Sequence, residues 1–320
     1  MSHVLNLTYQ NLGWQTAADL YLPPDFDEQK RYPAIVSTHP IGSCKEQTAG
    51  NVYAKGLAAA GFVVLVHDAS FQGASGGEPR FIEDPAIRVS DIRFAVDYLQ
   101  SLSYVDSDRI GAIGVCGGGA YTIHAGITDH RLKALVSITG VNYGRLIREG
   151  FAQFKPLELT QGIARMRTAQ AQGGATEPAD LLPASVAAAT AAGITDIDVL
   201  EATEYYKTAR GQQPHGATRQ LMSFTGASMG WDAFLHAEVL LTQPLMVVIG
   251  DKAGALAPIG MAGRSTAAPP PPTSTLSWPK AGPITTSTTK PSRWPSPWQA
   301  WCPSSSAPCD PAVGHPHPFK

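Results

Sequence analysis

Short apolar runs alternate with stretches of helical spacing over the first 150 residues, and this alternation constrains the fold more than any other feature. The runs at 34–38, 62–66 and 132–138 have the length and composition of buried strands. Residues 87–102 place apolar side chains at helical spacing. Strands that alternate with helices in this way form a parallel sheet that is covered by helices. The sequence therefore predicts an α/β fold.

The composition excludes several classes of function. The 24 basic residues are matched by 26 acidic ones without a dense basic run, so neither a nucleic acid nor a membrane surface is expected as a partner. No signal peptide is visible at the N-terminus, and no apolar run reaches the roughly 18 residues of a membrane span. Four widely spaced cysteines do not form a disulfide framework, so we expect a reduced, cytoplasmic setting.

Composition divides the chain into four segments. Residues 1–149 carry the alternating strands and helices and are predicted to form the core. Residues 150–234, rich in Ala, Gln, Thr and Gly, are predicted to be a helical cap inserted over the sheet, with a surface-exposed spacer as the alternative. The core continues at 235–255, which includes an apolar strand at 244–249. Residues 256–320 contain a proline run and lack an apolar period, so they are predicted to be an irregular, low-complexity and disordered tail.

The sharpest local signal is the turn at 114–119, Gly-Val-Cys-Gly-Gly-Gly. It follows a predicted strand and opens a predicted helix, which is the arrangement of a nucleophile elbow with Cys116 at its apex. The flanking glycines allow a close backbone approach, and a helix N-terminus favours the thiolate, which is the reactive form of cysteine. A buried, inert cysteine is the alternative. We predict that Cys116 is a catalytic nucleophile.

Such a nucleophile needs amide donors for the oxyanion. The N–H of Gly117 directly follows the nucleophile, and the second donor is expected from the loop after the strand at 34–38. Pro40 in that loop has no N–H, so Ile41 is the candidate for the oxyanion hole. His39 is counted with the substrate-binding residues, although we expect it to brace the turn rather than to transfer protons.

Two carboxylates and one arginine complete the set of candidates. Asp251 follows a late strand and is the candidate acid that orients a catalytic histidine, with an ordinary turn residue as the alternative. Asp68 is predicted to fix the loop at 71–80. Arg80 in this loop is a candidate substrate-binding residue for a carboxylate, and the alternative is a salt bridge that braces the loop.

The sequence supplies no convincing general base. The chain order of an elbow hydrolase is nucleophile, acid and histidine, yet only His315 and His317 follow Asp251, in a Pro-rich terminus. His124 lies two helical turns beyond Cys116, roughly 12 Å along the axis, and is too far away to reach the sulfur. The Cys and His residues near the C-terminus fit no zinc-binding spacing, so no metal is expected.

Four short motifs occur in order along the chain. They are His-Pro-Ile-Gly-Ser-Cys-Lys-Glu-Gln-Thr at 39–48, Asp68 with Gly-Ala-Ser-Gly-Gly-Glu-Pro-Arg at 73–80, Val105-Asp106 with Arg109-Ile-Gly111, and the turn at 114–119. Together they resemble the dienelactone-hydrolase-like branch of the α/β-hydrolase family, from about Leu20 to about Ala255. The resemblance implies an α/β-hydrolase fold, with a mostly parallel central sheet flanked by helices. It also implies a cysteine that opens a small-molecule ester or lactone through an acyl-enzyme, without a cofactor.

The closing histidine motif of that family is absent from this chain. One hypothesis is that a nucleotide was lost near Leu256, because residues 283–290, back-translated and shifted in frame, give His-Tyr-Asp-Leu-Tyr-Asp-Lys. The alternatives are a catalytically impaired or non-catalytic α/β-hydrolase-fold protein, and an acyltransferase that uses the same nucleophile. Loss of the last strand and helix also predicts an exposed sheet edge and low solubility.

Overall fold

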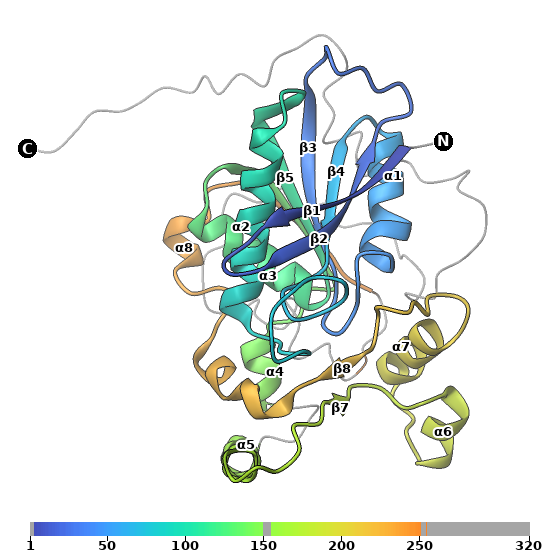
Figure 1. The fold of residues 1–320 in the computed structure, drawn as a ribbon, viewed down its shortest axis with the longest axis vertical. Helices are drawn as coiled ribbons and strands as arrows, with labels where there is room; N and C mark the ends of the chain where they lie inside the picture. The colour runs from blue at the N-terminus through green and yellow to red at the C-terminus, as the bar shows by residue number, and fades with distance from the viewer. Residues whose placement is uncertain (1–2, 150–154, 251–253, 255–320) are drawn as a thin grey trace, which may run out of the picture. The chain divides into compact units, whose positions relative to one another are not determined.

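The computed structural model describes residues 3–149, 155–250 and 254, and strands alternate with helices along most of this chain (Figure 1). The elements are β1 His3–Gln10, β2 Gln15–Leu22, β3 Tyr32–Thr38, η1 Thr48–Ala54, α1 Lys55–Ala59, β4 Val63–His67, α2 Pro85–Ser101, β5 Val105–Val115, α3 Gly117–Thr128, β6 Leu132–Ile138, α4 Tyr143–Glu149, α5 Pro156–Ala171, β7 Ala179–Asp180, α6 Val186–Ala191, α7 Ile197–Lys207, β8 Arg219–Gln220, η2 Met222–Gly230, α8 Ala237–Leu240 and β9 Leu245–Val248.

Seven of the strands form one sheet in the order β1-β2-β4-β3-β5-β6-β9. The strands from β4 to β9 are parallel to their neighbours in this order, whereas β1 pairs antiparallel with β2 and β2 pairs antiparallel with β4. The prediction of a mostly parallel α/β sheet is therefore confirmed, and so are the strands expected at 34–38, 62–66, 132–138 and 244–249.

Helices cover both faces of this sheet. Helices α2 and α3 pack against each other on one face, and α1 lies on the other (Figure 1). Every residue of β4 is buried, as expected for a strand enclosed by neighbours and helices. Helix α2 begins at Asp84, whose side chain accepts the N–H groups of Ala86 and Ile87, and Pro85 occupies the first turn. This cap fixes where α2 enters the core.

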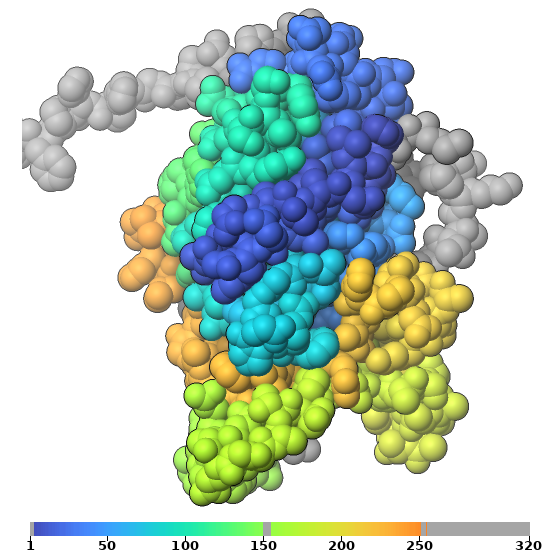
Figure 2. All heavy atoms as spheres, viewed as in Figure 1, coloured from blue at the N-terminus to red at the C-terminus, as the bar shows by residue number. Residues whose placement is uncertain are grey.

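Residues 155–220 lie beyond the carboxyl ends of the parallel strands and carry α5, α6, α7 and the β7–β8 pair (Figure 1). Two hydrogen bonds tie this segment to the loop after β3. The N–H of Thr218 donates to the Gly42 carbonyl at 2.9 Å, and Gln47 Nε2 donates to the Gly211 carbonyl at 2.6 Å. In the segment 71–82, cyan in Figure 2, Phe71 and Ile82 pack with Leu221 and Phe224.

Strand β9 is the last strand of the sheet in the described part of the chain, and it pairs only with β6 there. Val247 is 40% exposed, Ile249 is 52% exposed, and Val239 in α8 is 69% exposed. The tail predicted at 256–320 lies outside the described residues, as does Asp251. Among the helices that the structure describes, none has both the length and the apolar character of a membrane span.

Candidate active site

Cys116 occupies the turn between β5 and α3, and its side chain is partly exposed. Its backbone has φ 55° and ψ −124°, which is strained for a residue with a Cβ atom. Three backbone hydrogen bonds keep Cys116 in this conformation. Its N–H donates to the Ile138 carbonyl at 2.9 Å, and its carbonyl accepts the N–H groups of Gly119 and Val141 at 2.9 and 3.0 Å. A strained apex between strand and helix is the backbone arrangement of a nucleophile elbow.

The glycines around Cys116 permit close approaches of the backbone. A Cβ atom on Gly118 would lie 2.4 Å from the carbonyl oxygen of Thr38 and 2.7 Å from that of His39. The backbone of the loop after β3 is therefore in close contact with the first turn of α3. A Cβ atom on Gly117 would lie 2.6 Å from Ile41 Cγ1, so the two residues predicted to form the oxyanion hole are neighbours.

The candidate donors of the oxyanion hole are the backbone N–H groups of Gly117 and Ile41. The N–H of Gly117 interacts with the Cys116 sulfur and lowers its pKa, against the larger effect of burial. The N–H of Ile41 donates to no acceptor in the described part of the chain. The structure thus places Ile41 against Gly117, directly beside Cys116, so that three of the residues singled out in the sequence lie together.

The thiol itself is not activated. Burial raises the pKa of Cys116 to about 11, and the hydrogen bond from the Gly117 N–H opposes this only in part. The negative charges of Glu83 and Asp198 raise the pKa further, while the positive charge of Arg88 lowers it. The expectation of a thiolate favoured by the helix N-terminus is therefore not met, because the loss of water outweighs one amide dipole.

His39 is buried and uses both of its ring nitrogens. Nδ1 lies 2.7 Å from the Pro40 carbonyl oxygen, and Nε2 lies 3.0 Å from the Ala69 nitrogen, whose N–H it accepts. These partners assign the proton to Nδ1. Burial lowers the pKa of His39 well below its usual value, and the charge of Arg88 acts in the same direction. Neither nitrogen is left for a substrate, so the substrate-binding assignment is corrected: His39 braces the turn.

Arg80 likewise holds its own loop. Its guanidinium donates to three backbone carbonyls at 73–77, at distances of 2.5 to 3.3 Å. Because these bonds engage both terminal nitrogens, the geometry does not favour the predicted contact with a substrate carboxylate. The bracing alternative was right about the role and wrong about the partner, since the acceptors are carbonyls rather than a carboxylate.

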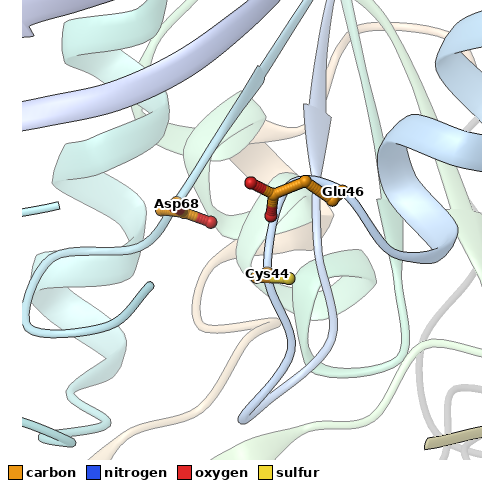
Figure 3. Close-up of side chains that lie close together, drawn as sticks. All are labelled: Cys44, Glu46 and Asp68. Carbon is orange, nitrogen blue, oxygen red and sulfur yellow. The ribbon is translucent and has the colours of Figure 1, made fainter. Parts of the chain in front are cut away.

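Cys44, Glu46 and Asp68 form a compact cluster in which the possible metal-ligand atoms lie within 4.8 Å of one another (Figure 3). Three of the four carboxylate oxygens already accept hydrogen bonds. Asp68 Oδ2 accepts the Ala74 N–H at 2.8 Å, which fixes the loop at 71–80 as predicted, and Asp68 Oδ1 accepts the Lys45 N–H at 2.8 Å. Lys45 Nζ lies 2.5 Å from Glu46 Oε1. Although burial opposes ionisation, hydrogen bonds from Lys45 and Cys44 lower the pKa of Glu46 to about 2. Lys45 thus supplies the positive charge that a metal ion would bring.

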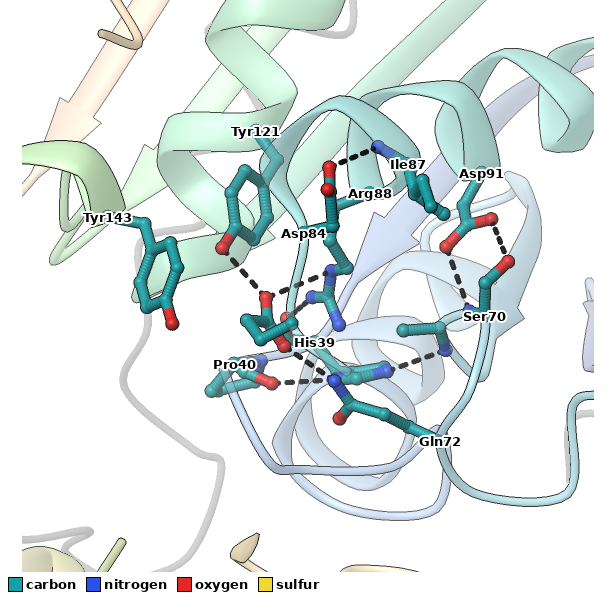
Figure 4. Close-up of polar contacts among 12 residues, drawn as sticks. His39, Pro40, Ser70, Gln72, Asp84, Ile87, Arg88, Asp91, Tyr121 and Tyr143 are labelled. Atoms are coloured by element: carbon teal, nitrogen blue, oxygen red, sulfur yellow. Dashed lines mark hydrogen bonds and ion pairs between the residues drawn. The ribbon is translucent and has the colours of Figure 1, made fainter. Parts of the chain in front are cut away.

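A buried polar network around Arg88 and Glu83 connects the loop after β3 to α3 (Figure 4). Arg88 Nη2 donates to the His39 carbonyl at 2.6 Å, and Arg88 Nε lies 3.6 Å from Glu83 Oε1. The Tyr121 hydroxyl donates to the same carboxylate oxygen at 2.7 Å, and Gln72 Nε2 donates to Glu83 Oε2 at 2.6 Å. The guanidinium also lies 5.0 Å from the centre of the Tyr121 ring.

Arg88 and Glu83 are not among the site residues that the sequence predicts, although the sequence contains a signal for Arg88. Arg88 precedes Ile92, Val96 and Leu99 at helical spacing, so it falls on the side of α2 that faces the core, and it is 2% exposed. A charged residue on the buried face of a helix requires a partner. That requirement is the clue that the network exists.

In the described chain, no hydrogen bond joins a histidine to Cys116. Burial lowers the pKa of His67 to about 3, so that imidazole stays neutral. His124 packs its ring on Trp231, with 5.4 Å between ring centres. His315 and His317 lie outside the described residues.

The profile of the X-Pro dipeptidyl-peptidase (S15) family matches residues 13–220, a range that includes the loop after β3 and the Cys116 turn. The chain belongs to this family. YcjY of Escherichia coli K12 is 42% identical to this S15-family chain over 242 residues, which cover 74% of the chain and 77% of YcjY. PA2218 of Pseudomonas aeruginosa is 32% identical over 255 residues, which cover 77% of the chain and 67% of PA2218.

Solved structures agree with the fold of this S15-family chain. The crystal structure of PA2218 superposes with a TM-score of 0.72 at 29% identity, over 78% of each chain. The α/β hydrolase GrgF from Penicillium superposes with a TM-score of 0.63 at 17% identity, over 79% of this chain and 82% of GrgF. The chain therefore has the α/β-hydrolase fold and is an enzyme of the α/β-hydrolase type. Membership of the dienelactone-hydrolase-like branch stays a prediction.

Proposed function

We propose that this S15-family protein cleaves neutral carboxylic esters or lactones through a thioester formed on Cys116. The observation that carries the proposal is the strained Cys116 turn, which has the Gly117 N–H at the sulfur and Ile41 packed against Gly117. A nucleophile next to two converging amide donors is the arrangement that acyl transfer requires.

The reaction has two halves. In the first, the Cys116 sulfur adds to the carbonyl carbon, the thiol proton passes to a general base, and the N–H groups of Gly117 and Ile41 hold the oxyanion. The C–O bond then breaks, the alcohol leaves with a proton, and a thioester remains. In the second half, water adds to the thioester, the C–S bond breaks, and the carboxylic acid leaves as the thiol is restored.

The general base is the part of this mechanism that the described residues do not supply. Since burial keeps the Cys116 thiol protonated near neutral pH, attack on an ester needs a base. We propose that Asp251 orients a histidine, and that this histidine belongs to the motif obtained when residues 283–290 are read in the shifted frame. The chain as written is then expected to form the thioester slowly and to release it more slowly still.

Charge near Cys116 favours a neutral substrate. The carboxylates of Glu83 and Asp198 both disfavour a negative charge on the sulfur. Arg88 is paired with Glu83 and donates a hydrogen bond to the His39 carbonyl. Arg80 donates its hydrogen bonds to carbonyls of its own loop. A substrate that carries a carboxylate would meet more negative charge here than an uncharged ester. We further propose that residues 150–234 act as a cap that shapes the pocket, together with the loop at 71–80.

Acylation by 4-nitrophenyl acetate tests this proposal without requiring the second half-reaction. Nitrophenolate leaves without being protonated, so the wild-type chain is expected to release about one equivalent and to carry one acetyl group on Cys116 in peptide mass spectra. The Cys116→Ala variant is expected to show neither. Ester turnover that survives Cys116→Ala would overturn the mechanism. Absence of both acylation and alkylation in the folded wild-type chain would favour the non-catalytic alternative.

The missing base is tested by a second comparison. Sequencing the gene reveals whether the frame is continuous near Leu256, and a chain with the frame restored is assayed beside the chain as written. Steady turnover of a panel of esters is expected for the restored chain only. Equal turnover by both chains would remove the need for a histidine from the shifted frame.

Two further activities are tested in the same assays. GrgF of Penicillium, which is 27% identical over 113 residues, is named a polyketide transferase, and this supports acyl transfer as a second candidate. Added amine or thiol acceptors are then expected to become acylated in place of water. The family name also raises peptide cleavage after an X-Pro pair, but an amine leaving group must be protonated, so we expect Gly-Pro-nitroanilide to react far more slowly than the nitrophenyl ester.

A further inference from the structure

Gln47 lies in the motif at 39–48 and is fully buried, yet it has no part in the proposed mechanism. A buried amide needs hydrogen-bond partners for its polar atoms. Gln47 Oε1 accepts the Ser43 hydroxyl at 2.8 Å and the Cys44 N–H at 3.2 Å. Gln47 Nε2 donates to the Gly211 carbonyl at 2.6 Å. One amide group therefore joins the loop after β3 to the chain beyond α7.

The chain at residue 216 packs against the same amide group. A Cβ atom on Gly216 would lie 2.5 Å from Gln47 Oε1 and 2.6 Å from Gln47 Nε2. Both distances are well below van der Waals contact, so a larger residue at 216 would displace the amide. Gly216 does not have a positive φ, so the close approach of Gln47 is what requires glycine at this position.

Thr218, two residues further on, contacts the same loop at Gly42. The N–H of Thr218 donates to the Gly42 carbonyl at 2.9 Å, and the N–H of Leu181 donates to the Thr218 carbonyl at 2.8 Å. A Cβ atom on Gly42 would lie 2.8 Å from Leu181 Cδ1 and 3.2 Å from Thr218 Cα. The ends of β7 and β8 therefore lie directly on the residue that follows Ile41.

These contacts fall next to the candidate donor of the oxyanion hole. Ile41 packs against the turn of the nucleophile, since a Cβ atom on Gly117 would lie 2.6 Å from Ile41 Cγ1. A displacement of the loop at 40–47 therefore moves Ile41 relative to Cys116. Such a displacement matters for catalysis, because a misplacement of about 1 Å can reduce a rate by about 10²-fold.

We propose that Gln47 is a positioning residue, whose amide holds the loop at 40–47 against residues 211–218 and keeps the Ile41 N–H in the place that acylation of Cys116 requires. This inference rests on the proposed function of Cys116. It gives the chain between α7 and β8 a part in the rate of the reaction, in addition to a part in shaping a pocket. Gln47 acts through Ile41 and is assigned no contact with the substrate.

Two substitutions disturb this contact from opposite sides. Gln47→Ala removes the amide and its hydrogen bonds to Ser43, Cys44 and Gly211. Gly216→Ala keeps the amide and displaces it with a methyl group. The atoms of Gln47 nearest to Gly216 belong to the amide, so the double variant Gln47→Ala/Gly216→Ala has room for the methyl group. We therefore expect the two effects not to add.

The test compares two reactions of Cys116 in the full chain at one pH. Both reactions use the thiolate, but acylation by 4-nitrophenyl acetate develops an oxyanion and alkylation by iodoacetamide does not. A change in the pKa of the thiol affects both rates, so the ratio of the acylation rate to the alkylation rate reports on the oxyanion donors.

The expected fall in this ratio follows from the cost of a misplaced donor. Complete removal of one oxyanion donor costs about 10²-fold or more. A donor that is only misplaced costs less, so we expect the ratio to fall by about 5- to 20-fold in Gln47→Ala and in Gly216→Ala. The double variant is expected to fall no further than the weaker of the two single variants.

Gln170→Ala and Gly230→Ala are the matched controls. Gln170 on α5 also uses its amide, and its Nε2 donates to Ser223 Oγ at 3.0 Å, away from the loop at 40–47. In the described chain, a Cβ atom on Gly230 would have open space around it. We expect the ratio to stay within about twofold of wild type in both controls. Urea denaturation checks that each variant is folded, and Gly216→Ala decides the test if Gln47→Ala does not fold.

The outcomes separate a positioning role from a structural one. A wild-type ratio in the folded Gln47→Ala and Gly216→Ala variants would overturn the positioning role and leave Cys116 in place. An equal loss of both reactions would also overturn it, because a purely structural amide would give that result. Losses that multiply in the double variant would show that the two residues act independently. If Cys116 of the wild-type chain is not acylated at all, the proposed function itself fails, and this inference with it.

Discussion

Arg88 donates a hydrogen bond of 2.6 Å from its guanidinium to the backbone carbonyl of His39. This bond joins α2 to the loop that carries the N–H of Ile41. Arg88 is also paired with Glu83 at 3.6 Å, and the two side chains are 2% and 0% exposed. Two opposite charges so deeply buried depend on each other, because removal of one leaves the other without compensation in a medium of low dielectric.

We therefore expect Arg88→Met to lower the free energy of unfolding by about 3–5 kcal/mol, the usual cost of an unpaired buried charge. Urea denaturation measures this change. Arg93→Met on the same helix removes a bond to Thr128 at the surface and is expected to cost about 0.5 kcal/mol or less. The double variant Arg88→Met/Glu83→Gln is expected to cost less than the sum of its parts. Equal costs for the two arginine variants would contradict the role of Arg88.

The reactivity of Cys116 should follow a high thiol pKa. Because burial raises the pKa of Cys116 to about 11, its rate of alkylation by iodoacetamide is expected to climb with pH through the alkaline range. Glu83→Gln removes a negative charge and is expected to move the profile to lower pH, and Arg88→Met to move it to higher pH. Peptide mass spectrometry measures the alkylation of Cys116 and Cys44 separately, and fully buried Cys44 serves as the unreactive control. A rate that is already level near neutral pH would contradict the assignment.

The effects of four buried groups on the pH dependence of the free energy of unfolding should nearly cancel. Burial raises the pKa values of Asp68 and Asp91 to about 6, so the folded chain keeps two protons that the unfolded chain releases. Burial lowers the pKa of His67 to about 3 and that of His39 well below its usual value, so the unfolded chain binds two protons that the folded chain excludes. Because these four groups bind nearly equal numbers of protons in the two states, the free energy of unfolding is expected to change little between about pH 5 and pH 6. It is expected to fall below about pH 5, where the unfolded chain also protonates Glu46, whose pKa in the folded chain is about 2.

Substitution of one of these four groups should make the free energy of unfolding depend on pH. Asp91→Asn removes one folded-state proton, so the unfolded chain then binds more protons and stability falls on acidification by up to about 1.4 kcal/mol per pH unit. Asp25→Asn changes an exposed carboxylate and is expected to keep the flat profile. Denaturation at several pH values measures all three chains. A steep slope in the wild-type chain would show that these four groups do not dominate.

The sequence was sufficient where a signal is local. The apolar runs located β3, β4, β6 and β9, and the glycine pattern located the turn around Cys116, because the residues that determine these features are adjacent in the chain. The β1–β2 hairpin was not singled out, although its residues 17–22 are all buried against the sheet.

The partners of individual side chains could not be predicted in the same way. Arg80 and His39 were recognised as notable residues, but their acceptors depend on how the loop closes in three dimensions. The raised pKa of Cys116 results from burial by many segments, so a motif of six residues could not reveal it.

The exposed end of the sheet makes a last prediction about self-association. Within residues 3–149 and 155–250, β9 pairs on one edge only, with β6, and it carries exposed apolar side chains; sheet edges of this kind pair with further chains. Val247→Lys places a charge on this edge and is expected to shift sedimentation toward the monomer and to raise solubility. Val52→Lys is the matched control, since Val52 is 50% exposed but lies in η1, outside the sheet. If both lysine variants raise solubility equally, added charge explains the gain; if Val247→Lys alone does so, the edge of β9 is where the chains meet.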